Sequence, residues 1–166
     1  MRRTQVSDLY WLGYLLTGDH ERTAGILIED LEMADAANPF FEGWMVRWSR
    51  KIFIAKVLGS VKPEVNPSQL RDRLRRLQRE TREGLRRIED AAGKADLERA
   101  VLAIDPFPRC ALLLCVFEKL AVADVATLLN SDRESVRTAA SIGLTELARN
   151  LAEDRNFNAA NEVKAA

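Results

Sequence analysis

The sequence predicts an all-α protein of two small helical lobes joined by a basic helical linker. Apolar residues recur at helical spacing along most of the chain, and glycines and prolines interrupt them where helices can end. An arginine-rich stretch separates the two halves. We expect a helical domain at 1–60, a linker with an Arg-rich helix at 61–96, a second helical domain at 97–152, and a disordered tail at 153–166.

Three helices are expected in the first domain. Ser7 is a suitable N-cap for a helix over 7–16, which Gly18 ends. A second helix is expected over 21–37. A third follows Asn38, a suitable cap, and has Pro39 in its first turn, where the missing N–H is tolerated.

The third helix, expected to end near Leu58, is predicted to bury one face. Spacing of 3.6 residues places on it Phe41, Trp44, Met45, Trp48, Ile52 and Ala55. The opposite face carries Arg47, Arg50, Lys51 and Ile54. Its basic side chains suit contact with phosphate, and a solvated basic face is an equally open interpretation.

The linker is predicted to form a basic helix with a narrow apolar stripe. Ser68 is a reasonable cap, and arginines from Arg71 to Arg87 crowd the rest of the helix. Gly84 weakens the helix by about 1 kcal/mol relative to Ala. The stripe consists of Leu70, Leu74, Leu77, Thr81, Leu85 and Ile88.

The last two helices of the second domain have the spacing of a helix-turn-helix. The first helix has an apolar face of Val122, Val125, Ala126 and Leu129. The second has an inward face of Val136, Ala140, Gly143 and Leu147.

The corner between these helices is Asn130-Ser131-Asp132. Asn130 tolerates the left-handed backbone that ends a helix. Either Ser131 or Asp132 can cap the next helix, and Ser131 with Glu134 has capping-box spacing. This motif commonly places a helix in the major groove of DNA, although an ordinary helical hairpin has the same periodicity.

Composition limits the possible functions. The formal net charge is zero, so DNA binding would have to rest on local basic faces. No stretch approaches the roughly 20 apolar residues that span a bilayer, so no membrane association is expected. The N-terminus lacks the pattern of a signal peptide, which makes the cytoplasm the expected location.

No constellation of residues predicts an enzyme, and no cofactor is expected. Cys110 and Cys115 are five positions apart in an apolar segment, a spacing that suits buried side chains rather than a disulfide. With only one histidine, His20, a zinc site is not expected. His20 has no nucleophile at a recognisable spacing, so a surface or capping role is favoured.

Two long segments together resemble a known family. The run LERAVLAIDPFPRCALLLCVFEKLAVADVATLLNSDRESVRTAASIGLTELARNLA is similar to the C-terminal promoter-binding domain of the extracytoplasmic-function sigma factors. The positions in register are Ile104, Arg109, Leu112 to Leu114, Leu120, Val125-Ala126, Leu129, Asp132, Ser135-Val136-Arg137 and Leu147.

The N-terminal half resembles the core polymerase-binding domain of the same family. The segment DLYWLGYLLTGDHERTAGILIEDL contains the Leu-Thr-Gly-Asp corner of that domain. The segment FFEGWMVRWSRKIFIAKVL is similar to its phenylalanine-rich entry and following helix, with Trp44, Arg47 and Arg50 on matching positions.

The resemblance implies a sigma-like transcription initiation factor that binds core RNA polymerase and promoter DNA, without cofactor or catalysis. An anti-sigma or other regulatory protein is a possible partner. The residues it places at DNA are Arg133, Ser135, Arg137, Thr138 and Ser141 in the recognition helix, and Arg47, Arg50 and Lys51 in the first domain.

The chain also departs from the family pattern. Ala139, Ile142 and Leu144 stand where family members carry arginines in the recognition helix. An alternative reading is therefore a regulator or mimic on the sigma scaffold that has lost promoter binding, with Ile142 and Leu144 as a partner-facing patch. A third reading is nonspecific binding of DNA or RNA through the 71–87 helix.

Overall fold

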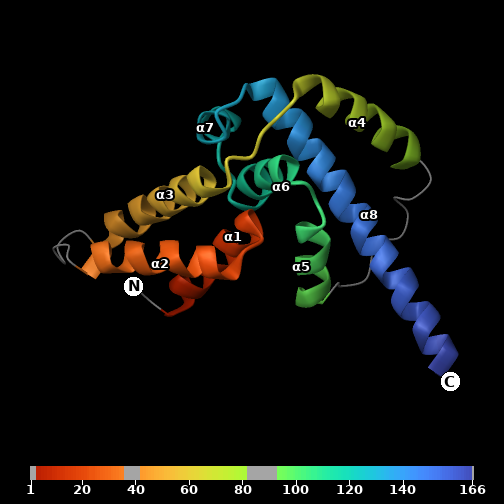
Figure 1. Ribbon diagram of the computed structural model, residues 1–166, viewed down its shortest axis with the longest axis horizontal. Coiled ribbons are helices and arrows are strands. Elements are labelled where there is room, and N and C mark those ends of the chain that lie inside the picture. Colours follow the sequence, from red (N-terminus) through yellow and green to blue (C-terminus); the bar gives the residue numbers. More distant parts are fainter. Residues whose placement is uncertain (1–2, 36–41, 82–92, 166) are drawn as a thin grey trace. The chain divides into compact units, whose positions relative to one another are not determined.

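The computed structural model describes residues 3–35, 42–81 and 93–165, and within them the side chains of residues 6–32, 50–79 and 93–153. Every regular element in these ranges is a helix, which confirms the all-α class (Figure 1). The chain divides into two compact units, Met1–Pro63 and Glu64–Ala166. Among the described helices, none is both long and apolar enough to cross a membrane.

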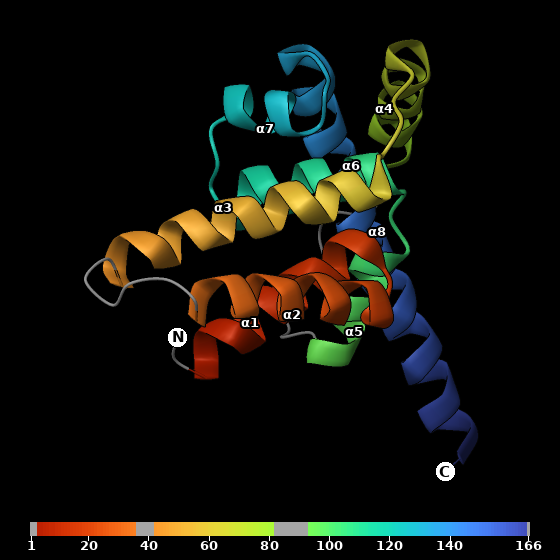
Figure 2. The ribbon, with the colours of Figure 1, turned by 60° about the vertical axis from the view of Figure 1, so that its left-hand side comes forward.

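The first unit consists of α1 (Arg3–Thr17), α2 (His20–Asp35) and α3 (Glu42–Val61), which pack against one another (Figure 2). Ser7 lies inside α1 and is not its cap, because the helix begins four positions earlier. The core of the unit includes Leu9, Leu12, Leu16, Leu27, Phe53, Ile54, Val57 and Leu58.

The corner between α1 and α2 is held by hydrogen bonds. Gly18 has a φ of 73°, a conformation that glycine adopts without steric strain. Asp19 caps α2, because its Oδ1 accepts from the backbone N–H of Arg22 at 3.0 Å. The Thr17 hydroxyl lies 3.0 Å from that of the fully buried Thr23, which donates to the Asp19 carbonyl at 2.8 Å. The Leu-Thr-Gly-Asp corner therefore joins and positions the two helices.

From residue 50 on, where its side chains are described, α3 buries a different face from the predicted one. Ile52 is only half-buried and Ala55 is exposed, whereas Phe53, Val57 and Leu58 are buried. Ile54, placed on the basic face by the sequence pattern, is also buried. Within residues 50–61, burial of Phe53, Ile54, Val57 and Leu58 removes more apolar area from water than burial of Ile52 and Ala55 would. The predicted cap at Asn38 and the first turn at Pro39 lie outside the described residues, as do the side chains of the two tryptophans.

The second unit consists of helices that pack around one long helix. They are α4 (Pro67–Thr81), α5 (Lys94–Leu102), α6 (Pro106–Leu112) with a π-helical continuation η3 (Leu113–Phe117), α7 (Val122–Leu128) and α8 (Arg133–Ala165). α8 contacts α4, α5, α6 and α7, and Figure 1 shows it in blue, running past them to the C-terminus. Where a disordered tail was expected from residue 153, the backbone continues as α8 to Ala165.

α4 belongs to the second unit rather than to a linker between domains. Leu70 and Leu77, on its predicted stripe, are buried, and the helix packs on α8. Asn66 is its cap instead of Ser68, because its Oδ1 accepts from the backbone N–H of Ser68 at 3.1 Å. The rest of the predicted basic helix, including Gly84, lies outside the described residues.

α6 and α8 cross closely at Gly143. A Cβ at this position would lie 2.8 Å from the carbonyl oxygen of Pro108 and 2.9 Å from the Cβ of Leu112. Two backbones can approach so closely only where one of them carries no side chain. Val136 and Leu147 are buried on the same side of α8, as the predicted inward face requires, and Ala140 is half-buried.

Candidate nucleic-acid interface

The corner between α7 and α8 is the predicted one. Asn130 has a φ of 48°, which confirms the left-handed residue at the end of α7. The N–H of Ser131 donates to the carbonyl of Ala126 at 2.9 Å, and the N–H of Asn130 donates to that of Thr127 at 3.2 Å. These are the two hydrogen bonds of a Schellman motif, so the angle at which the chain leaves α7 is fixed by the backbone.

Asp132 caps α8, which decides between the two candidates at the corner. Its Oδ1 accepts from the backbone N–H of Ser135 at 2.8 Å, and its Oδ2 accepts from the Ser135 hydroxyl at 2.6 Å. The hydroxyl bond and then the backbone bond lower the pKa of the Asp132 carboxyl, because both favour its charged form. The capping box of Ser131 with Glu134 is not formed, and Glu134 instead pairs with Arg71 at 3.3 Å.

Ser135 is not available for DNA contact in this conformation, so its predicted role is corrected. The residue is buried, and its hydroxyl is used by the capping carboxylate of Asp132. Position 135 therefore stabilises the start of α8. The resemblance had placed Ser135 among the DNA contacts, although the residue is buried in the second unit.

The other predicted DNA contacts of α8 lie on its outward face. Arg133, Arg137 and Ser141 are exposed, and Thr138 is half-buried. Within the described part of the chain, neither arginine forms an ion pair. The Ser141 hydroxyl donates to the carbonyl of Arg137 at 3.0 Å, so its lone pairs remain available outward. This face can offer two guanidinium groups and one hydroxyl to an anionic partner.

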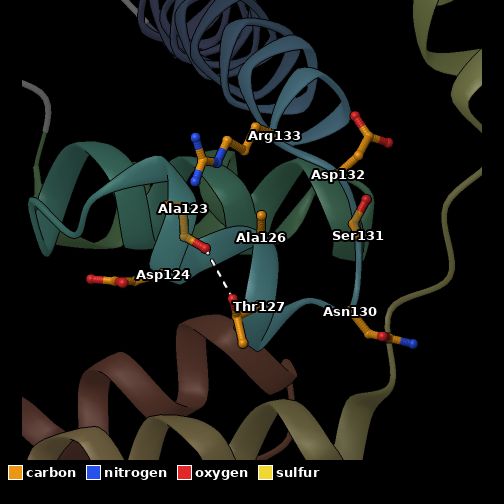
Figure 3. Close-up of a pocket in the computed structure, with 8 residues that line it drawn as sticks. All are labelled: Ala123, Asp124, Ala126, Thr127, Asn130, Ser131, Asp132 and Arg133. Atoms are coloured by element: carbon orange, nitrogen blue, oxygen red, sulfur yellow. Dashed lines mark hydrogen bonds between the residues drawn. The ribbon is translucent and has the colours of Figure 1, made fainter.

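An open hollow lies at the corner, between α7 and the start of α8 (Figure 3). In Figure 3 the Arg133 side chain extends from α8 towards α7, whereas Asn130 points away from the hollow. The Thr127 hydroxyl donates to the Ala123 carbonyl at 3.1 Å and so does not face a ligand unpaired. The hollow is lined by Ala123, Asp124, Ala126, Thr127, Asn130, Ser131, Asp132 and Arg133.

Packing explains the residues at two of the three α8 positions where the resemblance led us to expect arginine. Ala139 and Ile142 are completely buried, where an unpaired guanidinium would be costly. The predicted partner-facing patch of Ile142 and Leu144 is therefore wrong for Ile142. Leu144, by contrast, is 54% exposed. Because successive residues turn by about 100°, it lies on the same face as Arg133 and Arg137.

Arg73 fixes α4 to the rest of the second unit. Its guanidinium donates to the Glu146 carboxylate of α8 at 2.6 and 2.7 Å, and it also pairs with Asp105 before α6. Desolvation by burial is the largest single effect on the pKa of Arg73, and it lowers that pKa. The hydrogen bonds to Asp105 and Glu146, together with their negative charges, outweigh it, so the pKa is raised overall. Glu146 is only 3% exposed, so Arg73 compensates a carboxylate that is largely removed from water.

Of the three predicted basic residues of α3, the structure describes the side chains of Arg50 and Lys51. The side chain of Arg47 is outside the described residues. Arg50 is half-buried and lies one turn before Phe53 and Ile54, on the face that carries the core, and Lys51 is exposed. These residues belong to the first unit, and the α8 residues belong to the second.

The packing around Arg109, the two cysteines and His20 gives each of them a structural role. Arg109 is buried and donates to the carbonyl of Leu102 at 3.1 Å, which helps to hold the turn into α6. Burial raises the pKa of the buried Cys110 thiol to about 12 and also raises that of the half-buried Cys115. The His20 ring stacks on Tyr14 with centroids 3.6 Å apart. The described histidine, cysteine, aspartate and glutamate side chains form no group of three or more that could hold a metal ion.

Sequence reasoning predicted the basic helix over 71–87 but missed that α4 packs against α8, beside its first turns. The narrow apolar stripe of Leu70 and Leu77 indicated that α4 packs against another element, but the stripe does not identify α8 as that element.

Comparison of the chain with protein-family models, with curated proteins and with solved structures gives no match.

Proposed function

We propose that the chain is a sigma-like transcription initiation factor. In this proposal the second unit binds promoter DNA through α7 and α8, and the first unit docks on core RNA polymerase. The protein supplies recognition and strand opening in the cytoplasm, with no cofactor and no chemical step of its own. A regulatory protein such as an anti-sigma factor would control it.

The observation that carries the proposal is the presentation of Arg133, Arg137 and Ser141 at the start of α8. They are exposed in the first turns after a corner that the Schellman motif and the Asp132 cap hold. In a helix-turn-helix the N-terminal residues of the second helix contact base edges. An arginine there can donate two hydrogen bonds to guanine in the major groove.

The DNA-binding test begins with selection of preferred duplexes from a random pool by the full-length protein. Arg137→Ala should then weaken binding to the selected sequence by about 1–3 kcal/mol and flatten the preference among sequences. Arg99→Ala, an exposed arginine on α5, is the matched control for loss of one positive charge. The proposal fails if selection enriches no sequence, or if both variants bind like the wild type.

The polymerase half of the proposal is supported by the resemblance of residues 7–58 to a core-binding domain. A pull-down with the full chain from the source cytoplasm should retain the subunits of core RNA polymerase. Recovery of a different protein with no polymerase subunit would contradict this half and favour the second candidate below.

The second candidate is an interaction protein on the same scaffold that does not bind promoters. Leu144 favours it, because an apolar side chain that is 54% exposed lies among the predicted DNA contacts of α8. For this candidate Leu144→Glu should abolish capture of the protein partner, whereas Arg137→Ala should not. For the DNA-binding proposal Arg137→Ala should weaken duplex binding, whereas Leu144→Ala, which adds no charge to that face, should leave it nearly unchanged.

A further inference from the structure

The outer surface of α4 carries a row of arginines whose direction is fixed by packing. Leu70 and Leu77 are buried against the second unit, and Arg73 is held by Glu146 and Asp105. At about 100° per residue, Arg71, Arg75 and Arg79 then follow one another along the opposite, solvent-facing side, about 6 Å apart along the axis. All three are exposed.

This row begins beside the start of α8. Arg71 pairs with Glu134, the second residue of α8, at 3.3 Å. On α8, Arg133 directly precedes Glu134, and Arg137 lies three positions after it. Both arginines are exposed. The Arg71–Glu134 ion pair therefore joins the arginine row on α4 to the first turns of α8, and the two form one continuous surface.

The acidic residues on this surface are already engaged. Glu134 is paired with Arg71, Asp72 with Arg75, and Asp132 with the N-terminus of α8. In the part of the chain that the structure describes, Arg79, Arg133 and Arg137 have no ion pair. A surface with excess positive charge has thus formed on a chain whose formal net charge is zero.

We infer that α4 and α8 bind one DNA duplex as a single surface, with Arg75 and Arg79 of α4 on phosphates and the start of α8 in the major groove. The inference rests on the proposed function of α8 and adds a second contacting element to it. A cationic row fits a polyanion, and the adjacent corner favours a B-form duplex, because the major groove of A-form RNA is too narrow to admit a helix.

The test measures binding of the full chain to a fluorescent duplex at several salt concentrations. Arg75→Ala/Arg79→Ala should weaken binding to all sequences alike and reduce the slope of log affinity against log salt by about 1.8, since each lost phosphate contact removes about 0.9. Arg22→Ala/Arg99→Ala removes two exposed arginines elsewhere and should leave the slope unchanged. An unchanged helical circular-dichroism spectrum and melting temperature would establish that each variant is folded.

Three outcomes overturn the inference in different ways. If Arg137→Ala weakens binding but the α4 variant binds like the wild type, α8 binds DNA without α4, and only the further inference fails. If the wild type has no salt-dependent affinity for duplex DNA, the proposed function itself fails. If double-stranded or single-stranded RNA competes more strongly than duplex DNA, the assignment of the surface to DNA is wrong.

Discussion

Single residues decide how closely the helices of the first unit approach. Gly13 lies where α1 meets α2 and α3, and a Cβ there would be 2.7 Å from both Phe53 and Thr23. Both neighbours are fully buried, so neither can move aside without disturbing the core. Gly25, on α2 of the same unit, has no such neighbour within 4 Å.

The same substitution at these two glycines should therefore have opposite effects. Gly13→Ala should lower the free energy of unfolding by about 1–3 kcal/mol, because it overpacks the core. Gly25→Ala should raise it by about 0.5–1 kcal/mol, because alanine is favoured over glycine in a helix. Urea unfolding followed by circular dichroism measures both. Destabilisation of equal size at the two positions would show that the close contact at Gly13 is not real.

Asp132 is expected to make the stability of the second unit depend on pH. Its pKa in the folded protein lies below the ordinary 3.8, so the folded state binds fewer protons than the unfolded state as acid is added. The ionised Asp132 carboxylate stabilises the folded unit fully at pH values above its ordinary pKa. This stabilisation is lost as the pH falls through the lower pKa of the folded protein. Wild type should therefore lose more stability than Asp132→Asn between about pH 6 and about pH 3.

Asparagine is the informative replacement because it caps a helix about as well as aspartate but does not titrate. Unfolding by urea at the two pH values gives the comparison, and all other carboxyl groups are common to both proteins. An identical loss of stability in wild type and Asp132→Asn would show that the carboxyl pKa is not lowered in the folded state.

At the scale of elements, α4 is attached to α8 through Arg73. Removal of that guanidinium leaves the Glu146 carboxylate, which is 3% exposed, without its cation. Arg73→Ala should therefore lower the free energy of unfolding of the second unit by about 3 kcal/mol, the lower end for broken buried pairs, since Arg73 is itself partly exposed. Arg76→Ala, on the solvent side of the same helix, should change it by less than about 0.5 kcal/mol.

A double-mutant cycle separates the ion pair from lost packing. Glu146→Gln removes the buried charge, so adding Arg73→Ala in that background should cost much less than it does in the wild type. Equal losses in both backgrounds would mean that Arg73 acts only through its aliphatic stem.

The elements that the sequence predicted well are those with local causes. The left-handed Asn130, the break at Gly18 and the apolar face of α7 each follow from residues within a few positions of one another. The buried face of the second half of α3 and the DNA contact at Ser135 were predicted wrongly, because both depend on which distant surface packs against the helix. Glu146 illustrates the same limit: nothing nearby in the sequence indicates that Arg73 will compensate its charge.

At the scale of the whole molecule, the position of α4 changes where the second domain begins. A domain over 97–152, as the sequence pattern suggested, omits α4 together with Leu70 and Leu77. Full burial of two leucines stabilises by roughly 3–6 kcal/mol as an upper estimate. That is a large part of the roughly 5–15 kcal/mol that a small domain has in total.

We therefore expect a fragment of residues 64–166 to unfold cooperatively, and a fragment of residues 94–166 to be far less stable or only partly folded. The shorter fragment keeps α5 to α8 but exposes the surface of α8 on which α4 packs, and it leaves Glu146 without Arg73. Circular dichroism with urea unfolding of both fragments measures the difference. If the two fragments unfold at the same urea concentration, α4 does not contribute to the domain, and the sequence-based boundary at 97 would be the better description.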